Sequence, residues 1–398
     1  MTTQEGMQHS PKEKIWTREF VSICFANFFV FLGFQMTLPT LPIFVKEIGG
    51  NDQMIGIVVG IFTFSALLFR PYAGHALETR GRGFVYMVGI ILFTIAVASY
   101  GFMTAIVGLL LMRMLHGVGF GLVSTASGTI ASDLIPPSRL GEGMGYFGLS
   151  GNLALALGPA LGLALVGHIS FISLFLICGL LGVISFLFAS RIRYKKVEKS
   201  PYKTTTMKFD VFEKAALPPA ILLFFITITF GGIASFLPLL TAEKGIAGIE
   251  LYFVVYALFL MVSRTFSGQI YDRKGHLFVF PPGTVLVFIA MVLLAWLPNS
   301  LTLMVAAAFY GTGFGMIQPA LQAWAVSSAS ANRKGMANAT FFSFFDLGVG
   351  IGAMVFGYIA FTFSYSAIYV ASAFSVVLSI LLYTVFMFRD KKKAYHAE

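Results

Sequence analysis

Residues 70–82 read Arg70-Pro-Tyr-Ala-Gly-His-Ala-Leu-Glu-Thr-Arg-Gly-Arg82, a short polar hinge between two long apolar runs. A second copy lies 194 positions later and reads Arg264-Thr-Phe-Ser-Gly-Gln-Ile-Tyr-Asp-Arg-Lys-Gly-His276. The offset aligns the leading arginines, two glycines and one acidic residue of each stretch. Because the same offset recurs further along the chain, the sequence indicates two related halves.

The repeat extends into the apolar runs on either side of these stretches. Three glycines of the fourth apolar run align with glycines 194 residues later, and Asn152 aligns with Asp346. We therefore expect an N-terminal six-helix bundle at 1–190, a charged cytoplasmic linker at 191–214, and a C-terminal six-helix bundle with a short tail at 215–398. Parallel repeats of six helices are a known transporter plan, in which the substrate site lies between the halves near the bilayer midplane.

The composition is that of a chain surrounded mostly by lipid. Of its 398 residues, 57% are hydrophobic and only 11% are charged, whereas soluble domains carry about 25% charged residues. A transmembrane helix needs about 20 mostly apolar residues. We predict an all-α membrane protein with twelve such helices, at 19–44, 53–73, 83–103, 105–130, 141–165, 168–190, 215–241, 249–270, 277–297, 300–326, 335–361 and 364–388.

The net charge of +10 is distributed unevenly between the two sides of the expected membrane. Of the 27 Lys and Arg residues, 24 fall in segments on the side of the termini, and only Lys46 and Lys244 fall in the loops of the other side. This bias predicts a multi-pass protein of the cell membrane with both termini in the cytoplasm. The basic charge is thus an orientation signal, and we expect membrane lipids but no nucleic acid as partners. Binding of anionic lipid by the 191–214 linker remains an alternative use of its charge.

Two further features limit the function classes. Residues 1–18 are polar and mixed in charge, and no small-residue cleavage site follows the first apolar run, so the first helix is expected to stay in the membrane. The cysteines, Cys24 and Cys178, fit no metal spacing. We expect no metal, cofactor, catalytic residue or enzymatic activity, and a chain that acts as a monomer.

Three motifs resemble those of the major facilitator superfamily. The stretch from Gly74 to Arg82 resembles the family's G-x-L-a-D-R-x-G-R-K loop, with glutamate in place of the usual aspartate. The run from Arg113 to Gly121 resembles its R-x-x-x-G-x-G motif, and Gly158-Pro-Ala-Leu-Gly162 resembles part of its antiporter motif. The chain is therefore similar to twelve-helix drug:proton antiporters, which implies alternating access and proton-driven export.

The resemblance implies a gating role for the repeated polar stretches. A cluster of Arg and acidic residues at the cytoplasmic end would latch the two halves together while the transporter faces outward, and Gly74 would allow a close helix approach. The alternative is that these charges only set the topology. The predicted gating residues are Arg70, Gly74, Glu78, Arg80, Arg82, Asp133, Gly268, Asp272 and Gly275; the predicted helix-packing residues are Gly158, Pro159 and Gly162.

Asp346 is the main candidate for proton coupling. It is expected about 16 Å into its helix, where an ionised carboxylate costs at least about 2.5 kcal/mol, so protonation near neutral pH becomes accessible. Its repeat partner Asn152 cannot titrate. Arg113 and His116, one helical turn apart, are further candidates, with Arg113 one conceivable partner of Asp346 and structural roles as the alternative. Glu142, near Arg139, is a weaker candidate.

Uncharged polar groups in the apolar runs are candidates for the substrate cavity. They are Asn27, Gln35, Asn152, Tyr310 and Gln318. With 15% aromatic residues, such a cavity suits a small apolar or amphipathic substrate. We predict a proton-coupled secondary transporter that exports such molecules. A facilitator or importer of a polar nutrient, and a membrane protein that handles lipids or other amphiphiles, are the alternatives.

Overall fold

The computed structural model describes residues 14–136, 139–194, 212–330 and 334–395. These residues form twelve helices long and apolar enough to cross a membrane, and no named strand occurs among them. The first six are α1 (Arg18–Glu47), α2 (Asp52–Thr79), α3 (Arg82–Ser99), α4 (Ile106–Leu134), α5 (Leu140–Leu165) and α6 (Phe171–Ala189). The second six are α7 (Leu217–Glu243), α8 (Ile249–Lys274), α9 (Phe280–Trp296), α10 (Ser300–Ser327), α11 (Lys334–Thr362) and α12 (Tyr365–Tyr395). Short 3-10 turns accompany them as η1 (Tyr100–Phe102), η3 (Lys214–Ala216) and η4 (His276–Phe278).

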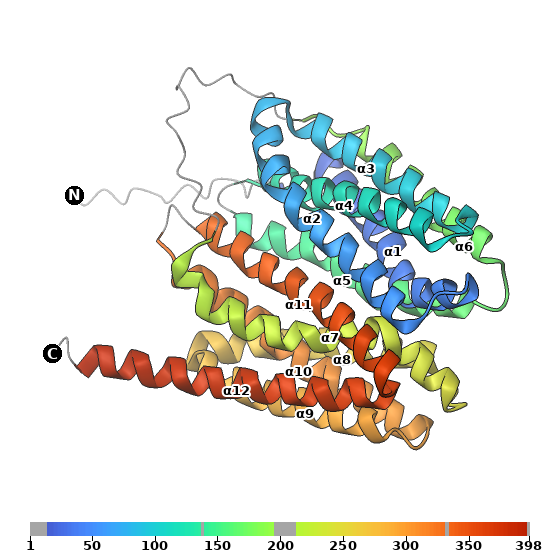
Figure 1. The fold of residues 1–398 in the computed structure, drawn as a ribbon. Coiled ribbons are helices and arrows are strands. Elements are labelled where there is room, and N and C mark those ends of the chain that lie inside the picture. The colour runs from blue at the N-terminus through green and yellow to red at the C-terminus, as the bar shows by residue number, and fades with distance from the viewer. Residues whose placement is uncertain (1–13, 137–138, 195–211, 331–333, 396–398) are drawn as a thin grey trace, which may run out of the picture.

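The helices are arranged as two bundles of six, as the repeat predicted. Figure 1 shows the N-terminal bundle in blue to green and the C-terminal bundle in yellow to red. The bundles meet mainly where α2 packs against α11 and where α5 packs against α8. These two contacts are equivalent in the repeat, because α2 corresponds to α8 and α5 to α11. We call the end where α1 begins and α12 ends the termini end, and the other the opposite end.

The polar hinge at residues 70–82 is shorter than the sequence predicted. α2 does not end near residue 73 but continues through Pro71 to Thr79. The turn itself occurs at Gly81, whose φ of 99° lies in the region that favours glycine. Gly275 takes the same role after α8, with a φ of 73°. As a result, Arg70 lies inside a membrane-spanning helix rather than in a loop.

A seam of small residues holds α2 against α11 towards the opposite end. A side chain added at Gly56 would place its Cβ 2.6 Å from the Ala353 carbonyl, and one at Gly357 would place it 2.6 Å from the Asp52 carbonyl. Close backbone approach through small residues is the usual way in which membrane helices pack. The Tyr365 hydroxyl also donates a 2.7 Å hydrogen bond to the Asp52 carboxylate. The two bundles are therefore in tight contact on this side.

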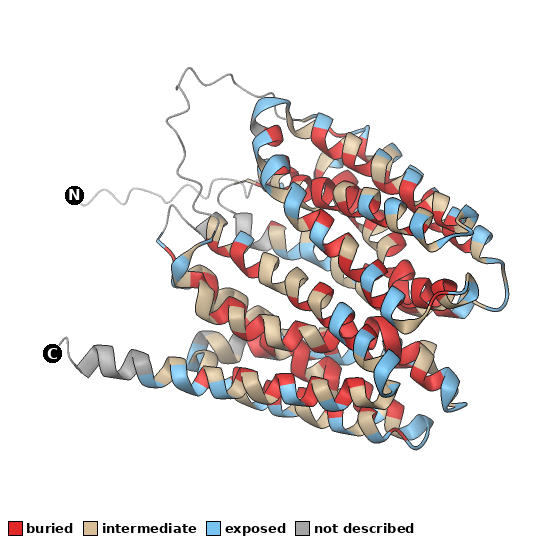
Figure 2. Cartoon of the chain, in the orientation of Figure 1, coloured by how far each residue is buried: buried red, intermediate tan, exposed pale blue. Residues whose placement is uncertain are grey.

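The burial pattern fits a membrane protein. Buried positions lie along the packed faces of the helices, and exposed positions lie on the outside of the bundles (Figure 2). Many exposed residues are large and apolar, including Leu68, Trp296 and Phe388. A soluble monomer rarely exposes so much contiguous apolar surface, whereas lipid is a suitable neighbour for it.

Candidate functional site

An ion pair links the two bundles in the middle of the membrane-spanning region. Nη2 of Arg70 on α2 lies 2.5 Å from Oδ2 of Asp346 on α11, and the two side chains are 21% and 23% exposed. At 1.5 Å per residue, Arg70 lies about 14 Å from the termini end of α2, and Asp346 about 18 Å from that of α11. Both positions are near the midplane of a hydrocarbon core about 30 Å thick. Arg113, which the sequence offered as one possible partner of Asp346, does not contact it.

A second polar group links the bundles between α8 and α5. Arg264 donates from Nη1 to Oδ1 of Asn152 at 2.6 Å, and from Nη2 to Oε1 of Gln318 on α10. Its Nε is buried and has no hydrogen-bond partner among the described residues. All three side chains are half-buried. Arg264 lies about 15 Å from the termini end of α8, so this group is at a depth similar to that of the first.

The two cross-bundle contacts are repeat equivalents of each other. Arg70 aligns with Arg264, and Asp346 aligns with Asn152, at the same offset. Each arginine therefore reaches from the second helix of one half to the fifth helix of the other half. The contacts differ by one charge, because Arg70 has a carboxylate partner and Arg264 has two neutral amides. The repeat relates the residues of one contact to those of the other, but only the structure shows that the helices that carry them face each other.

Arg113 and His116 form a separate buried cluster inside the N-terminal bundle. Arg113 is 1% exposed; its Nε donates to the Val58 carbonyl at 3.1 Å and its Nη1 to the Tyr100 hydroxyl at 3.3 Å. Nδ1 of His116 lies 2.6 Å from that hydroxyl and 3.2 Å from Nη1 of Arg113. The guanidinium also lies over the Phe62 ring, 4.4 Å from its centroid. The cluster ties α2, η1 and α4 together and does not reach Asp346.

Three predicted cavity residues lie inside a single bundle; two of them are hydrogen-bonded there, and Oε1 of Gln35 is buried with no partner among the described residues. Asn27 donates to the Ser150 hydroxyl at 2.9 Å, and the Tyr310 hydroxyl lies 3.0 Å from that of Thr229. Gln35 is 7% exposed and packs between α1 and α5. In this conformation Asn27 and Tyr310 bond to neighbouring helices of their own bundle, as polar side chains in apolar helices often do. Asn152 and Gln318, in contrast, lie at the cross-bundle contact of Arg264.

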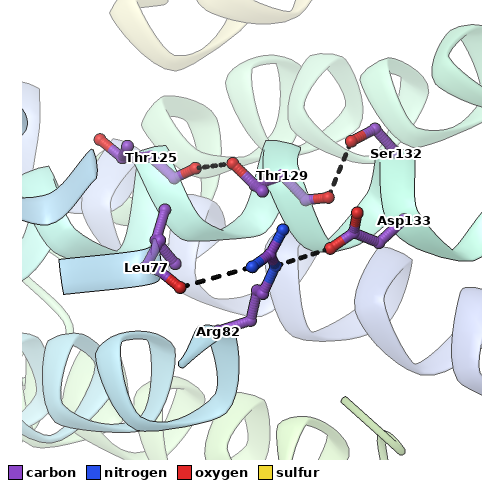
Figure 3. A network of polar contacts seen from close by, with 6 residues as sticks. All are labelled: Leu77, Arg82, Thr125, Thr129, Ser132 and Asp133. Carbon is purple, nitrogen blue, oxygen red and sulfur yellow. Dashed lines mark hydrogen bonds and ion pairs between the residues drawn. The ribbon is translucent and has the colours of Figure 1, made fainter. Parts of the chain in front are cut away.

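In this conformation, the charge pair predicted at the termini end lies within one bundle. Nε of Arg82 donates to Oδ2 of Asp133 at 2.8 Å, and Nη1 donates to the Leu77 carbonyl at 3.5 Å. Figure 3 shows that these residues lie at the junction of α2, α3 and α4, beside hydroxyl-to-carbonyl bonds along α4. All of these helices belong to the N-terminal bundle. In the second half, the position equivalent to Arg82 is His276, which stacks on Trp324 with ring centroids 4.3 Å apart, and the position equivalent to Asp133 is Ser327.

The predicted glycines divide into two groups. A Cβ at Gly162 would lie 2.7 Å from the Met36 carbonyl, and Gly158 is also pressed against α1, so both positions require small residues. Pro159 lies between them inside α5. At Gly74 and Gly268, in contrast, an added Cβ would meet nothing within 4 Å. The close approach predicted at Gly74 is therefore not present in this structure.

Among the remaining predicted side chains, the described one is Arg80. The Arg80 guanidinium lies 5.9 Å from the centroid of the Phe84 ring in the same bundle. The side chains predicted at Glu78, Glu142 and Asp272 lie outside the described part of the chain.

Comparison with known proteins identifies the family. The family model described as Major Facilitator Superfamily matches residues 23–342 and 279–397. The chain belongs to the Major Facilitator Superfamily. An uncharacterized MFS-type transporter of Methanocaldococcus jannaschii is 26% identical over 91% of this chain and 96% of its own length.

Two further superfamily relatives come from Staphylococcus aureus. Quinolone resistance protein NorA is 23% identical over 84% of this chain and 87% of its own length. The staphylopine export protein is 24% identical over 86% of this chain and 89% of its own length. Among solved structures, the nucleoside transporter NupG superposes with a TM-score of 0.74 over 93% of this chain and 99% of its own, at 15% identity. That likeness supports the Major Facilitator Superfamily fold.

The position of the cross-bundle contacts bears on how such a transporter works. The contacts described above lie either at the level of the two arginines or nearer to the opposite end. The α2–α11 seam closes the opposite end in this conformation. A transporter with alternating access must open this seam in another state, so the Arg70–Asp346 pair lies on a contact that has to break.

Proposed function

We propose that this transporter is a proton-coupled exporter of small amphipathic molecules in the cell membrane, with the termini end in the cytoplasm. The observation that carries the proposal is the Arg70–Asp346 ion pair across the bundles. The repeat places a carboxylate at this position in only one half, so the pair is a titratable link near the membrane midplane that the equivalent Arg264 contact lacks. Quinolone resistance protein NorA and the staphylopine export protein, both relatives, support export as the direction.

Protonation of Asp346 changes the strength of this link. An ionised carboxylate attracts the guanidinium of Arg70 strongly in a region of low dielectric constant, whereas a protonated one offers only a neutral acceptor. Breaking a buried pair leaves an uncompensated charge, which proton binding removes. Protonation of Asp346 therefore favours separation of α2 and α11: we propose that Asp346 takes up a proton from the outside when the seam is open, and that its release to the cytoplasm restores the pair. Transport of substrate in the opposite direction is coupled to this exchange.

Two further parts of the proposal follow from the chain itself. The excess of Lys and Arg on the side of the termini favours a cytoplasmic location of that side. A single chain contains both bundles and the contacts between them, so we propose that the monomer is the functional unit.

Everted membrane vesicles that contain the full chain provide the test. With norfloxacin, a fluorescent quinolone, as the probe, we expect accumulation when the vesicle interior is acidified and loss of accumulation when nigericin collapses the pH gradient. The variant Asp346→Asn should lose gradient-driven accumulation. Asn338→Ala, on the same helix but bonded to Gln322, is the matched control and should retain it. Full accumulation by Asp346→Asn would refute the proposal.

A further inference from the structure

Arg264 is a cation near the membrane midplane whose hydrogen-bond partners among the described residues are neutral. Its guanidinium bonds to the amide oxygens of Asn152 and Gln318, and no described carboxylate lies within ion-pair distance of it. A guanidinium has five N–H donors, of which two are used in these bonds, and its Nε is buried without a partner. A charge inside the membrane-spanning region is costly unless an opposite charge or good hydrogen bonds compensate for it.

The other half of the molecule shows what is missing at Arg264. There, the equivalent arginine is neutralised by the carboxylate of Asp346. At Arg264, the chain provides an asparagine at the position of that carboxylate. Asn152 has nearly the shape of an aspartate but lacks its charge, so the group has the geometry of an ion pair and lacks its anion.

We propose that Arg264, with Asn152 and Gln318, binds the carboxylate of an amphipathic substrate. This inference rests on the proposed transport of small molecules and specifies their chemical class. A guanidinium matches a carboxylate in a bidentate arrangement, and Nε with Nη2 forms one such edge once the Gln318 amide moves aside. Arg70 does not offer an equivalent site, because its Nη2 is already paired with the carboxylate of Asp346.

The surroundings of the group suit a substrate with an apolar body. Leu149, one helical turn before Asn152 on α5, is 47% exposed and offers apolar surface beside the amide. Arg264, Asn152 and Gln318 are each half-buried rather than sealed. The site thus combines one charge-selective contact with neighbouring apolar area, which is the usual composition of a small-molecule site.

Equilibrium binding to the full chain in lipid nanodiscs tests this site without any proton gradient. The probes are dansylglycine, which carries a carboxylate, and its neutral amide, dansylglycinamide. We expect the acid to bind at least about tenfold more tightly than the amide, because hydrogen bonds to charged groups are stronger than neutral ones. Arg264→Gln should remove this preference while amide binding, which reports the fold, stays similar.

Asn152→Asp is the decisive variant, because it supplies the missing charge from within. It should weaken binding of the acid at least about tenfold and leave binding of the amide similar. Asn152→Ala, which adds no charge, should weaken the acid by no more than about threefold. Equal affinity of the wild type for acid and amide, including no binding of either, would overturn the inference, as would equal losses in Asn152→Asp and Asn152→Ala. Since no gradient is used, failure here leaves proton coupling by Asp346 to its own test.

Discussion

The Arg70–Asp346 pair should hold the α2–α11 seam closed, and breaking it should make the seam open more often. Removing one partner of a buried pair costs about 3–5 kcal/mol, and exposed pairs contribute about 0–1 kcal/mol. With each side chain about one-fifth exposed, we take about 2 kcal/mol for this pair. Since 1.4 kcal/mol is a factor of ten, loss of the pair should raise the ratio of open to closed seam roughly 30-fold.

A cysteine inside the seam reports this ratio. Thr63 packs against Gly350, where an added Cβ would lie 2.7 Å from the Thr63 Cβ. A cysteine at position 63 is therefore shielded while the seam is closed. The variant Thr63→Cys is made in a chain from which Cys24 and Cys178 have been removed. A membrane-impermeant maleimide should label it roughly 30-fold faster when Asp346→Asn is added, and acidification should accelerate labelling only where Asp346 is present.

The double variant and a reference position complete this test. Arg70→Gln should accelerate labelling about as much as Asp346→Asn, and the double variant no more than either, because both changes remove one bond. Leu301→Cys is the reference position, because the Leu301 side chain is 73% exposed. Its labelling rate corrects for intrinsic thiol reactivity. Unchanged labelling in both single variants, or additive effects in the double variant, would refute the reasoning.

Three further predictions concern contacts away from this pair. Gly357→Ala should reduce transport and accelerate seam labelling, because the new methyl group would lie 2.6 Å from the Asp52 carbonyl. Arg82→Ala should lower thermal stability by about 0.5–1 kcal/mol without changing seam labelling, since its bond to Asp133 lies within one bundle; slower labelling would indicate that Arg82 latches the termini end. Arg113→Lys should destabilise the purified protein nearly as much as Arg113→Ala, because a lysine cannot reproduce the forked contacts; a wild-type melting temperature would contradict this.

Much of the fold could be predicted because membrane helices leave strong local signals. Twelve apolar runs of sufficient length gave the helices, and the repeat gave the two bundles. The turn at Gly81 was also predictable, since glycine is the residue that favours its positive φ. The end of α2 was less accessible, because Arg70 and Pro71 resemble a helix boundary while the helix in fact continues to Thr79.

The partners of the charged residues could not be predicted in the same way. Asp346 was identified from its depth and its charge, but its partner depends on which helix of the other bundle faces α11. The sequence offered Arg113 as the only charged partner and assigned Arg70 to the gating stretch, whereas helix facing places Arg70 beside Asp346. The α2–α11 seam was also missed, although Gly56 and Gly60 have the four-residue spacing typical of close helix contacts.

Coupled proton movement in proteoliposomes tests the central role of Asp346 most directly. Vesicles loaded with norfloxacin and the pH indicator pyranine are diluted into medium without norfloxacin, and protein-free vesicles correct for passive leakage. As norfloxacin leaves through the wild-type protein, protons should enter and acidify the interior. With Asp346→Asn, this acidification should be absent. Equal acidification with Asp346→Asn, or none with the wild type, would contradict the account.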